Sequence, residues 1–491
     1  MRINANNQIE AINSYEVFDL ASRSNFKIVK YLDLGVKKIR LIINSKDFLS
    51  LIEHQLAYSL VDSVDNYSST IVVWNELEPE ILSEKVQSYL SSDIKLRIRL
   101  QKLLSKKNVQ SFEVFSKDDD SVLISFDCNR GIINAYDPSS NTYYYGVKNL
   151  EPEEFLKEGH IFVQILNKIL RTPTSNLVHG AVVGLHNKGI LFCARGQRGK
   201  STLSVMSMLD GFEYVSDDYL VLEKTEGKLL SYPIYSIITL SPKMYNALFD
   251  KLNGVKFISN NARKDKYVFN IESFHDNFRK AYPIELCMFP EIVSESKPSI
   301  VPCKKGRAIT QIVQSTVSQM GDIADSETIK KLISMISKYE YYQINLCPDI
   351  NLNVEILRQF IEAYESSKQD QKIEEQLIED ITFDIANIID CNTGAIYTMN
   401  KFATNIYEQL KRGVSINEIK TVLQDKIKSS ALDKIFKQLD KLSTSLNEIG
   451  IILNNSNFYK KPMLNFDFIR ECNHNLSIVK FYNKTSQELL N

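Results

Sequence analysis

The sequence lacks any long apolar run, which limits the classes of protein it can be. No stretch approaches the roughly 20 apolar residues that a helix needs to cross a membrane, and residues 1–7 are polar, without an apolar signal segment. A surplus of charge of one sign is also lacking, since 59 basic side chains stand against 60 acidic ones. We therefore expect neither a membrane nor a nucleic acid as partner.

Paired cysteines and metal-binding clusters are lacking too. The seven cysteines are scattered, and none lies in a CxxC pair or with histidines at zinc spacing. This usage is typical of a reduced, cytoplasmic protein. A chain of 491 residues is too long for a single hydrophobic core, so we expect two to four domains.

One segment carries most of the chemical information in the chain. It follows an apolar, strand-like run at residues 190–193 and opens a helical pattern at 200–209. Its residues are Ala194, Arg195, Gly196, Gln197, Arg198, Gly199, Lys200, Ser201 and Thr202. Strand, glycine-bearing loop, Gly-Lys-Ser and helix together are the context of a P-loop, in which backbone N–H groups and the helix dipole hold phosphate.

The roles within this loop follow from its chemistry. Lys200 is predicted to reach the β- and γ-phosphates of a nucleotide, and the Ser201 hydroxyl to bind Mg²⁺. Ala194 stands where the motif usually begins with glycine, which is tolerable at the end of a strand if its φ stays negative. The segment predicts a nucleoside triphosphate site that uses ATP and Mg²⁺.

An acidic pair follows at a suitable distance. The helix is expected to end at Asp210-Gly211, and a strand at 212–216 then delivers Asp217 and Asp218 at its carboxyl end. Two carboxylates that face a phosphate loop can bind Mg²⁺ and accept a proton from an attacking hydroxyl. A solvated turn is the simpler alternative for this pair.

A histidine is expected to approach the same loop from the N-terminal side. Residues 181–185 and 189–194 predict two strands joined across Asn187-Lys188, with His186 opposite Gly189. That register places His179 opposite Gly196, beside the phosphate loop. The other histidines, His160 among them, are interpreted as structural.

These features resemble the HPr kinase/phosphorylase family and its phosphoenolpyruvate carboxykinase-like relatives. The resemblance covers about residues 175–225, with His179-Gly180, the hairpin, the phosphate loop and Ser216-Asp217-Asp218 as matching residues. It implies that Asp218 takes the proton from a serine hydroxyl, that His179 and Lys200 act beside it, and that Ser201 holds Mg²⁺. Asp217 of the acidic pair is expected to hold Mg²⁺ as well. Residues 301–307 loosely resemble a later basic segment of that family.

A second resemblance lies near the C-terminus. Residues 381–390 and 394–399 predict a hairpin, Asn400 a helix cap, and Ser415 with Glu418 a capping box. Over about residues 376–455 the order and spacing of the elements resemble the PqqD-type domain, a small winged-helix fold. The resemblance implies binding of a precursor-peptide leader by strand addition to a sheet edge. A winged helix that binds DNA or only packs is the alternative.

The sequence thus predicts an α/β protein with four regions. These are an N-terminal α+β region (1–155), an HPr kinase-like P-loop domain (156–365), a PqqD-like winged-helix domain (373–455) and a tail (456–491). The predicted activity is ATP-dependent phosphorylation of a Ser or Thr hydroxyl in a ribosomally made precursor peptide, and self-association is left open. Phosphorylation of a small molecule, or nucleotide-gated delivery of a peptide without catalysis, are the alternatives.

Overall fold

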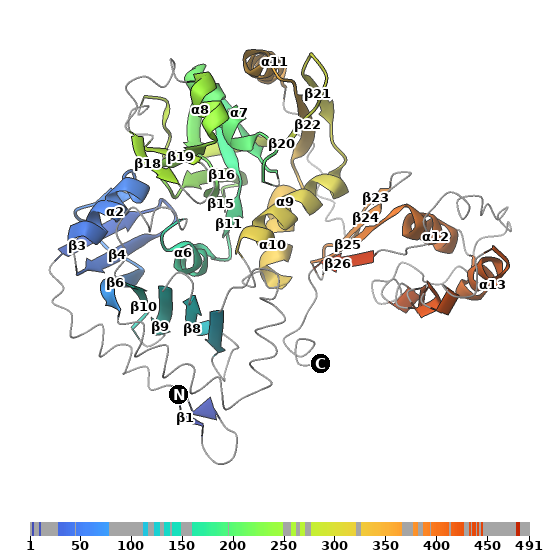
Figure 1. Cartoon of the computed structure of the whole chain (residues 1–491), viewed down its shortest axis with the longest axis horizontal. Helices are drawn as coiled ribbons and strands as arrows, with labels where there is room; N and C mark the ends of the chain where they lie inside the picture. The colour runs from blue at the N-terminus through green and yellow to red at the C-terminus, as the bar shows by residue number, and fades with distance from the viewer. Residues whose placement is uncertain are drawn as a thin grey trace. The chain divides into compact units, whose positions relative to one another are not determined.

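The computed structural model describes residues 2–3, 9–10, 28–77, 111–148, 160–320, 326–365, 377–444 and 478–481, with short breaks inside the longer ranges (Figure 1). The described chain forms two compact units. Unit 1 holds the residues up to Val301 and those from Tyr342 to Ser366, and unit 2 holds Pro302–Tyr341 and Ser367–Lys484. The chain is a mixed α/β protein with several sheets, and none of its described helices is long and apolar enough to cross a membrane.

Unit 1 begins with a mixed eight-stranded sheet in the order β5-β3-β4-β6-β10-β9-β8-β7. Its elements are β3 (Ile28–Asp33), β4 (Lys38–Ile43), α2 (Lys46–Leu56), β5 (Leu60–Val61), β6 (Ser69–Leu77), β7 (Ser111–Phe115), β8 (Val122–Asp127), β9 (Ile132–Asp137) and β10 (Thr142–Lys148). Alternation of buried and partly exposed residues along β4 gives this sheet one buried face, as period-two patterning predicts. The sequence pattern also predicts a helix over residues 80–103, which lies outside the described residues.

The second sheet of unit 1 carries the phosphate loop. Its strand order is β11-β15-β16-β20-β13-β12-β14, with β22 added beside β20 and β21 beside β22. Its strands are β11 (Ser175–His179), β12 (Ala181–Leu185), β13 (Lys188–Phe192), β14 (Glu213–Ser216), β15 (Tyr219–Thr225), β16 (Lys228–Pro233), β20 (Tyr282–Ile292), β21 (Ser299–Pro302) and β22 (Glu340–Leu346). A smaller three-stranded sheet is formed by β17 (Ile237–Leu240), β19 (Lys266–Asn270) and β18 (Phe257–Asn261).

The predicted hairpin forms, but its register differs from the prediction. Leu185 pairs with Lys188 and Ala181 with Phe192, so the two-residue loop is His186-Asn187 and not Asn187-Lys188. Both loop residues have positive φ, 54° and 62°, which is the backbone geometry that suits a two-residue hairpin turn. In this register His179 no longer falls opposite Gly196; it lies on β11, paired with Tyr219 of β15.

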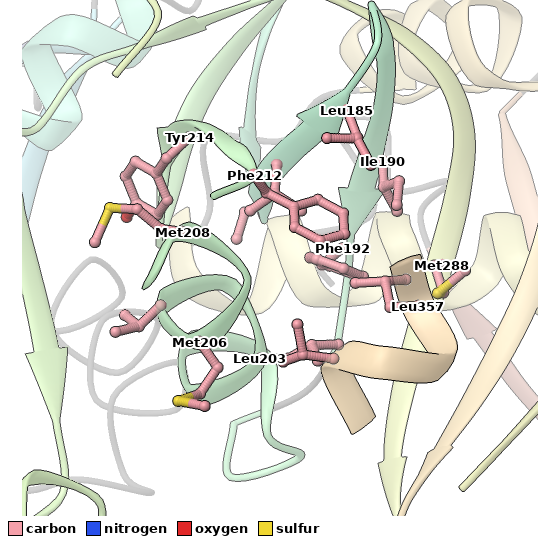
Figure 2. Close-up of a cluster of buried hydrophobic side chains, with 14 of the residues drawn as sticks. Leu185, Ile190, Phe192, Leu203, Met206, Met208, Phe212, Tyr214, Met288 and Leu357 are labelled. Atoms are coloured by element: carbon pink, nitrogen blue, oxygen red, sulfur yellow. The ribbon is translucent and has the colours of Figure 1, made fainter. Parts of the chain in front are cut away.

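A buried apolar cluster fixes the helix that follows the phosphate loop. Leu203, Met206 and Met208 of helix α7 (Lys200–Leu209) belong to one buried cluster with Phe192 of β13 and Leu357 of α11 (Ile350–Ala363), and Leu203 lies on the side of Phe192 and Leu357 (Figure 2). These side chains are 2% exposed or less. Burial of each is worth about 1.5–3 kcal/mol relative to exposure, so the start of α7 rests on a rigid base.

Unit 2 combines helices with an antiparallel sheet. Helix α9 (Lys305–Met320) lies against β23 (Leu377–Ile381) and β24 (Ala386–Asp390), and helix α10 (Ser326–Ile336) packs on α9. The sheet continues with β25 (Ala395–Met399) and β26 (Ile478–Phe481). The two units therefore do not follow the predicted boundary near residue 365, because 302–341 groups with the C-terminal sheet.

The local predictions in unit 2 agree with the structure where it describes them. The Asn400 side chain accepts a hydrogen bond from the Ala403 N–H at the start of α12 (Lys401–Lys411). Ser415 and Glu418 form the reciprocal capping box of α13 (Ile416–Lys426), at 2.8 and 3.2 Å. The described residues between 432 and 444 are helical, and the predicted strand at 450–453 lies outside the described residues. A winged helix as such stays a prediction.

Candidate functional site: the polar cluster at the start of α7

The loop between β13 and α7 ends in a conformation that glycine makes accessible. Gly199 has a φ of 91°, and a Cβ there would lie 2.5 Å from the Leu346 Cδ1 atom. Glycine also leaves the first turn of α7 without a side-chain cap, so its N–H groups can bind an anion. At Gly196 a Cβ would have open space around it, which marks this part of the loop as accessible.

The residues of the predicted phosphate loop differ from one another in solvent exposure. Ala194 is buried, Gly196, Gln197 and Arg198 are exposed, and Ser201 and Thr202 are partly buried in the first turn of α7. Arg198 Nη1 contacts Glu291 Oε1 of β20 at 3.0 Å. Arg195 lies outside the described residues.

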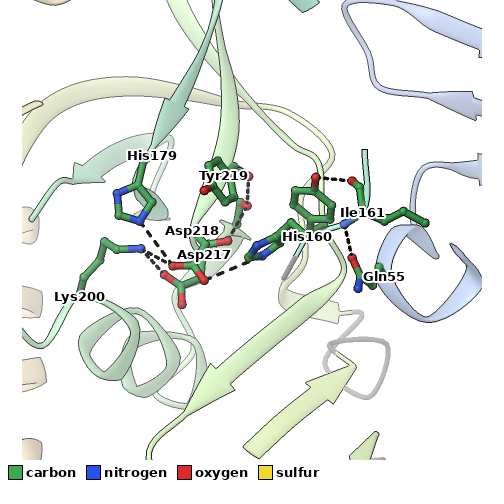
Figure 3. A network of polar contacts seen from close by, with 10 residues as sticks. Gln55, His160, Ile161, His179, Lys200, Asp217, Asp218 and Tyr219 are labelled. Atoms are coloured by element: carbon green, nitrogen blue, oxygen red, sulfur yellow. Dashed lines mark hydrogen bonds and ion pairs between the residues drawn. The ribbon is translucent and has the colours of Figure 1, made fainter. Parts of the chain in front are cut away.

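Lys200 is the centre of a charged cluster (Figure 3). Its side chain is 8% exposed, and Nζ donates to Asp217 Oδ1 at 2.8 Å and to Asp218 Oδ1 at 3.1 Å. Burial alone would lower the pKa of Lys200, but the two carboxylates raise it above its usual value. Lys200 is therefore a cation at neutral pH, held in place by these two carboxylates.

Asp218 owes its position to an unusual backbone conformation. Its φ is 72°, which is rare for a residue with a side chain. The Gly180 N–H donates to the Asp218 carbonyl at 3.0 Å, so the end of β11 stabilises this turn. Non-glycine residues in such a conformation cluster at functional sites.

Two histidines flank the Asp218 carboxylate (Figure 3). His179 Nε2 lies 3.7 Å from Oδ1, and His160 Nε2 lies 3.9 Å from Oδ2. Burial alone would raise the pKa of Asp218, but Lys200, His179 and His160 together hold it well below its usual range. Burial lowers the pKa of His160 to about 4, with Asp218 opposing that effect only in part. At neutral pH the site thus contains an ionised Asp218 and an uncharged His160.

Sequence reasoning missed His160, which was interpreted as structural. The amphipathic pattern of residues 154–170 predicts one helix that would enclose His160, whereas α6 (Val163–Leu170) begins three residues after it. Phe162, with a φ of 60°, separates the helix from the preceding chain, so His160 can turn toward Asp218. Residues 154–159 lie outside the described residues.

The basic segment at 301–307 contacts β23 rather than the residues around Lys200. Asp380 of β23 accepts a hydrogen bond from the Arg307 N–H at 2.8 Å and lies 3.5 Å from Lys304 Nζ. These contacts cap the first turn of α9 within unit 2, and they give the segment a structural role there.

The residues around Lys200 fit a divalent cation. Asp217 Oδ2 is a buried carboxylate oxygen for which the described residues provide no hydrogen-bond partner, and a buried acceptor of this kind is costly unless it is used. Carboxylate and hydroxyl oxygens are the ligands that Mg²⁺ prefers. Within the described residues, however, no group of three or more His, Cys, Asp or Glu side chains is arranged to bind a metal, so such an ion would depend on nucleotide phosphates and water.

Comparison with known proteins gives little further guidance. No protein-family model matches the chain, and no curated protein matches it. Among solved structures, the HPr(Ser) kinase/phosphatase from Coxiella burnetii is similar over 38% of this chain and 95% of its own length, with 15% sequence identity and a TM-score of 0.21. A likeness this low defines neither the fold nor the function.

Proposed function

We propose that the chain is an ATP-dependent kinase that phosphorylates a Ser or Thr hydroxyl of a ribosomally made precursor peptide. The observation that carries this proposal is the Lys200 cluster: a buried lysine at the start of α7, joined to two carboxylates from the end of β14, with the histidine of β11 beside them. Phosphoryl transfer needs little more from a protein than such positioning and charge.

The proposed reaction begins with an exchange of partners at Lys200. When ATP binds, its phosphates lie at the N-terminus of α7, and Lys200 contacts the β- and γ-phosphates. Asp217 and Ser201 are the residues that would hold Mg²⁺, which neutralises phosphate charge when bound. Lys200 then neutralises Asp218 less completely, so the pKa of Asp218 rises and the carboxylate becomes a better proton acceptor.

The γ-phosphoryl group is then transferred by in-line attack of the peptide hydroxyl. Asp218 accepts the proton of the peptide hydroxyl, the hydroxyl oxygen bonds to the γ-phosphorus, and the bond between that phosphorus and the β,γ-bridging oxygen breaks. ADP leaves with the electron pair of that bond. His179, 3.7 Å from Asp218 Oδ1, keeps the carboxylate oriented during the step.

Unit 2 supplies the proposed peptide-binding surface. The edge of β25 that faces away from β24 pairs with β26. Ile396 lies opposite Phe481 at one end and Met399 opposite Ile478 at the other, so β26 lies almost eighty residues further along the chain. An edge that binds one separate antiparallel segment has the hydrogen-bonding pattern to bind another. We propose that the leader pairs with β25 in place of β26, which raises the effective concentration of the core peptide.

The test is transfer of radiolabel from [γ-³²P]ATP to a precursor peptide encoded beside the gene. The proposal predicts label on the full peptide and a much higher KM, with little change in kcat, for the same peptide without its leader. Label on a small molecule only would favour the small-molecule kinase. Peptide binding that depends on nucleotide but yields no label would favour delivery without catalysis.

A further inference from the structure

His160 reaches the candidate site from a segment that is held on both sides by buried side chains. Its ring contacts two tyrosines, with centroid distances of 4.9 Å to Tyr219 and 4.4 Å to Tyr235, and these two tyrosine rings lie 6.1 Å from each other. The Tyr235 hydroxyl donates to the carbonyl of the next residue, Ile161, at 2.7 Å. Tyr235 is 1% exposed, so both contacts are shielded from solvent.

The second support of this segment comes from the N-terminal sheet region. Gln55 of α2 is fully buried, and its Oε1 atom accepts the Ile161 N–H at 2.9 Å (Figure 3). The Gln55 carbonyl accepts the Ser236 N–H at 2.6 Å, next to Tyr235. Gln55 thus fixes both the backbone beside His160 and the backbone beside the tyrosine that packs on it.

We propose that His160 is a positioning residue for the Asp218 carboxylate, and that the N-terminal region completes the site by holding His160 through Gln55. The proposal rests on the phosphotransfer function proposed above. It assigns a role to residues 1–155, in which the sequence shows no chemistry of its own.

The role of His160 follows from how the two oxygens of Asp218 are used. Oδ1 faces Lys200 and His179, whereas Oδ2 faces His160. Oδ2 is therefore the oxygen left to accept the hydroxyl proton, and His160 limits the directions in which it can point. Because His160 is uncharged at neutral pH, it orients Oδ2 without neutralising it.

The first test is a comparison of His160→Asn with His186→Asn in the full-length kinase. His186 lies in the exposed β12–β13 turn, where asparagine tolerates the positive φ, so that variant should behave as wild type. His160→Asn should lower kcat about 10- to 100-fold, the usual effect of losing a group that orients a functional side chain, and leave the KM for ATP unchanged. Gln55→Leu should act in the same direction with a smaller effect.

The pH profile separates positioning from a merely structural role. The charged or titratable groups that face Asp218 are Lys200, His179, His160 and the neighbouring Asp217. At the low pH where Asp218 takes up its proton, His160 is itself protonated and opposes that uptake. His160→Asn should therefore move the acid limb of kcat to higher pH. A variant with wild-type kcat and an unmoved acid limb would overturn the proposal.

A second measurement keeps the inference separate from the kinase function. The chain has six histidines, so ¹³C-histidine labelling of the intact protein gives few signals, and His160 is assigned by its loss in His160→Asn or, if that variant does not fold, His160→Gln. The His160 signal should shift in Asp218→Asn and stay unchanged in Asp210→Asn. If the wild type transfers no phosphate, the kinase function fails and this measurement alone decides: an unmoved His160 signal in Asp218→Asn refutes the positioning role.

Discussion

At the scale of residues, the adjacent carboxylates of Asp217 and Asp218 have different roles in the proposed reaction. Asp217 is 1% exposed on its side chain and has an unused buried oxygen, which suits a Mg²⁺ ligand. Asp218 is about a quarter exposed and lies between two histidines, which suits a group that meets the incoming hydroxyl. Their different surroundings lead to different expected losses on substitution.

Asp218→Asn should preserve binding of ATP with Mg²⁺ while lowering kcat by about 10²–10⁴, the usual contribution of a general base. Asp217→Asn should instead raise the Mg²⁺ concentration needed for half-maximal activity. Steady-state kinetics over a Mg²⁺ series check both variants, and thermal melting confirms that each is folded. If both lose only nucleotide affinity, neither carboxylate is the base.

His160 makes a prediction for stability as well. Its pKa is about 4 in the fold and about 6.5 in an unfolded chain, so between these values only the unfolded state binds the proton. The contribution of the uncharged His160 to the free energy of unfolding is fully present above pH 6.5. It is lost as the pH drops toward 4, by up to about 3 kcal/mol. Asp218 adds nothing to this pH dependence between pH 5 and 7.5. Its carboxyl group is ionised over that range both in the unfolded chain and in the fold, where its pKa is lowered.

Urea denaturation at pH 7.5 and pH 5 checks this expectation in wild type and His160→Gln. The wild type should lose more of its free energy of unfolding on acidification than the variant loses. Equal losses in the two proteins would show that His160 is not buried uncharged in the folded state.

At the scale of elements, local sequence signals were sufficient wherever they were strong. The helix after the phosphate loop was predicted with its bounds, and the Ser415 capping box was predicted with its residues. The hairpin register was not, because Asn187-Lys188 and His186-Asn187 are both plausible two-residue loops from sequence. The choice depends on which pair takes positive φ, and a shift of this kind displaces every pairing along both strands.

The position of β26 could not be predicted, since pairing between residues 396–399 and 478–481 is a long-range contact without a local signal. It leads to a test of where the leader binds. Deletion of residues 476–491 should free the β25 edge and raise the affinity for the leader peptide several-fold, measured by fluorescence anisotropy. Deletion of residues 482–491 is the matched control, because it retains β26.

The outcome depends on which sheet edge the leader uses. A leader that pairs with β25 must displace β26 and therefore gains from the longer deletion. Unchanged affinity in both deletions would contradict binding at β25 and leave β23 as the sheet edge available in the described part of unit 2.

At the scale of the whole molecule, the two units alternate along the chain. Unit 2 begins with 302–341, unit 1 resumes at 342–366, and unit 2 continues after that. A truncation near residue 370 would seem from sequence to separate the kinase from the peptide domain. In the structure it removes Asp380, which caps α9, so a single cut does not yield an intact unit 2. Only the folded chain shows this, because domain boundaries read from sequence assume continuous segments.

Contacts between residues far apart in the sequence are also the reason why the site was only partly predictable. Lys200, Asp217 and Asp218 were found because the phosphate loop and the end of a strand mark them, and the structure brings them together with His179. His179 was predicted from a hairpin register that is wrong, and it reaches Asp218 from the end of β11 instead. His160 comes from the break before α6 and depends on Gln55 of α2, more than a hundred residues earlier. No local pattern connects residues so far apart in sequence.

The central claim is that the Lys200 cluster is an ATP·Mg²⁺ site, and calorimetric titration of the full-length protein tests it most directly. Wild type should bind ATP in the presence of Mg²⁺, and Lys200→Met, which keeps an unbranched side chain of similar length without the charge, should lose most of that affinity. Lys224→Met, on the exposed end of β15, is the matched control and should bind as wild type. Equal affinity in wild type and Lys200→Met, or no binding by wild type, would contradict the account.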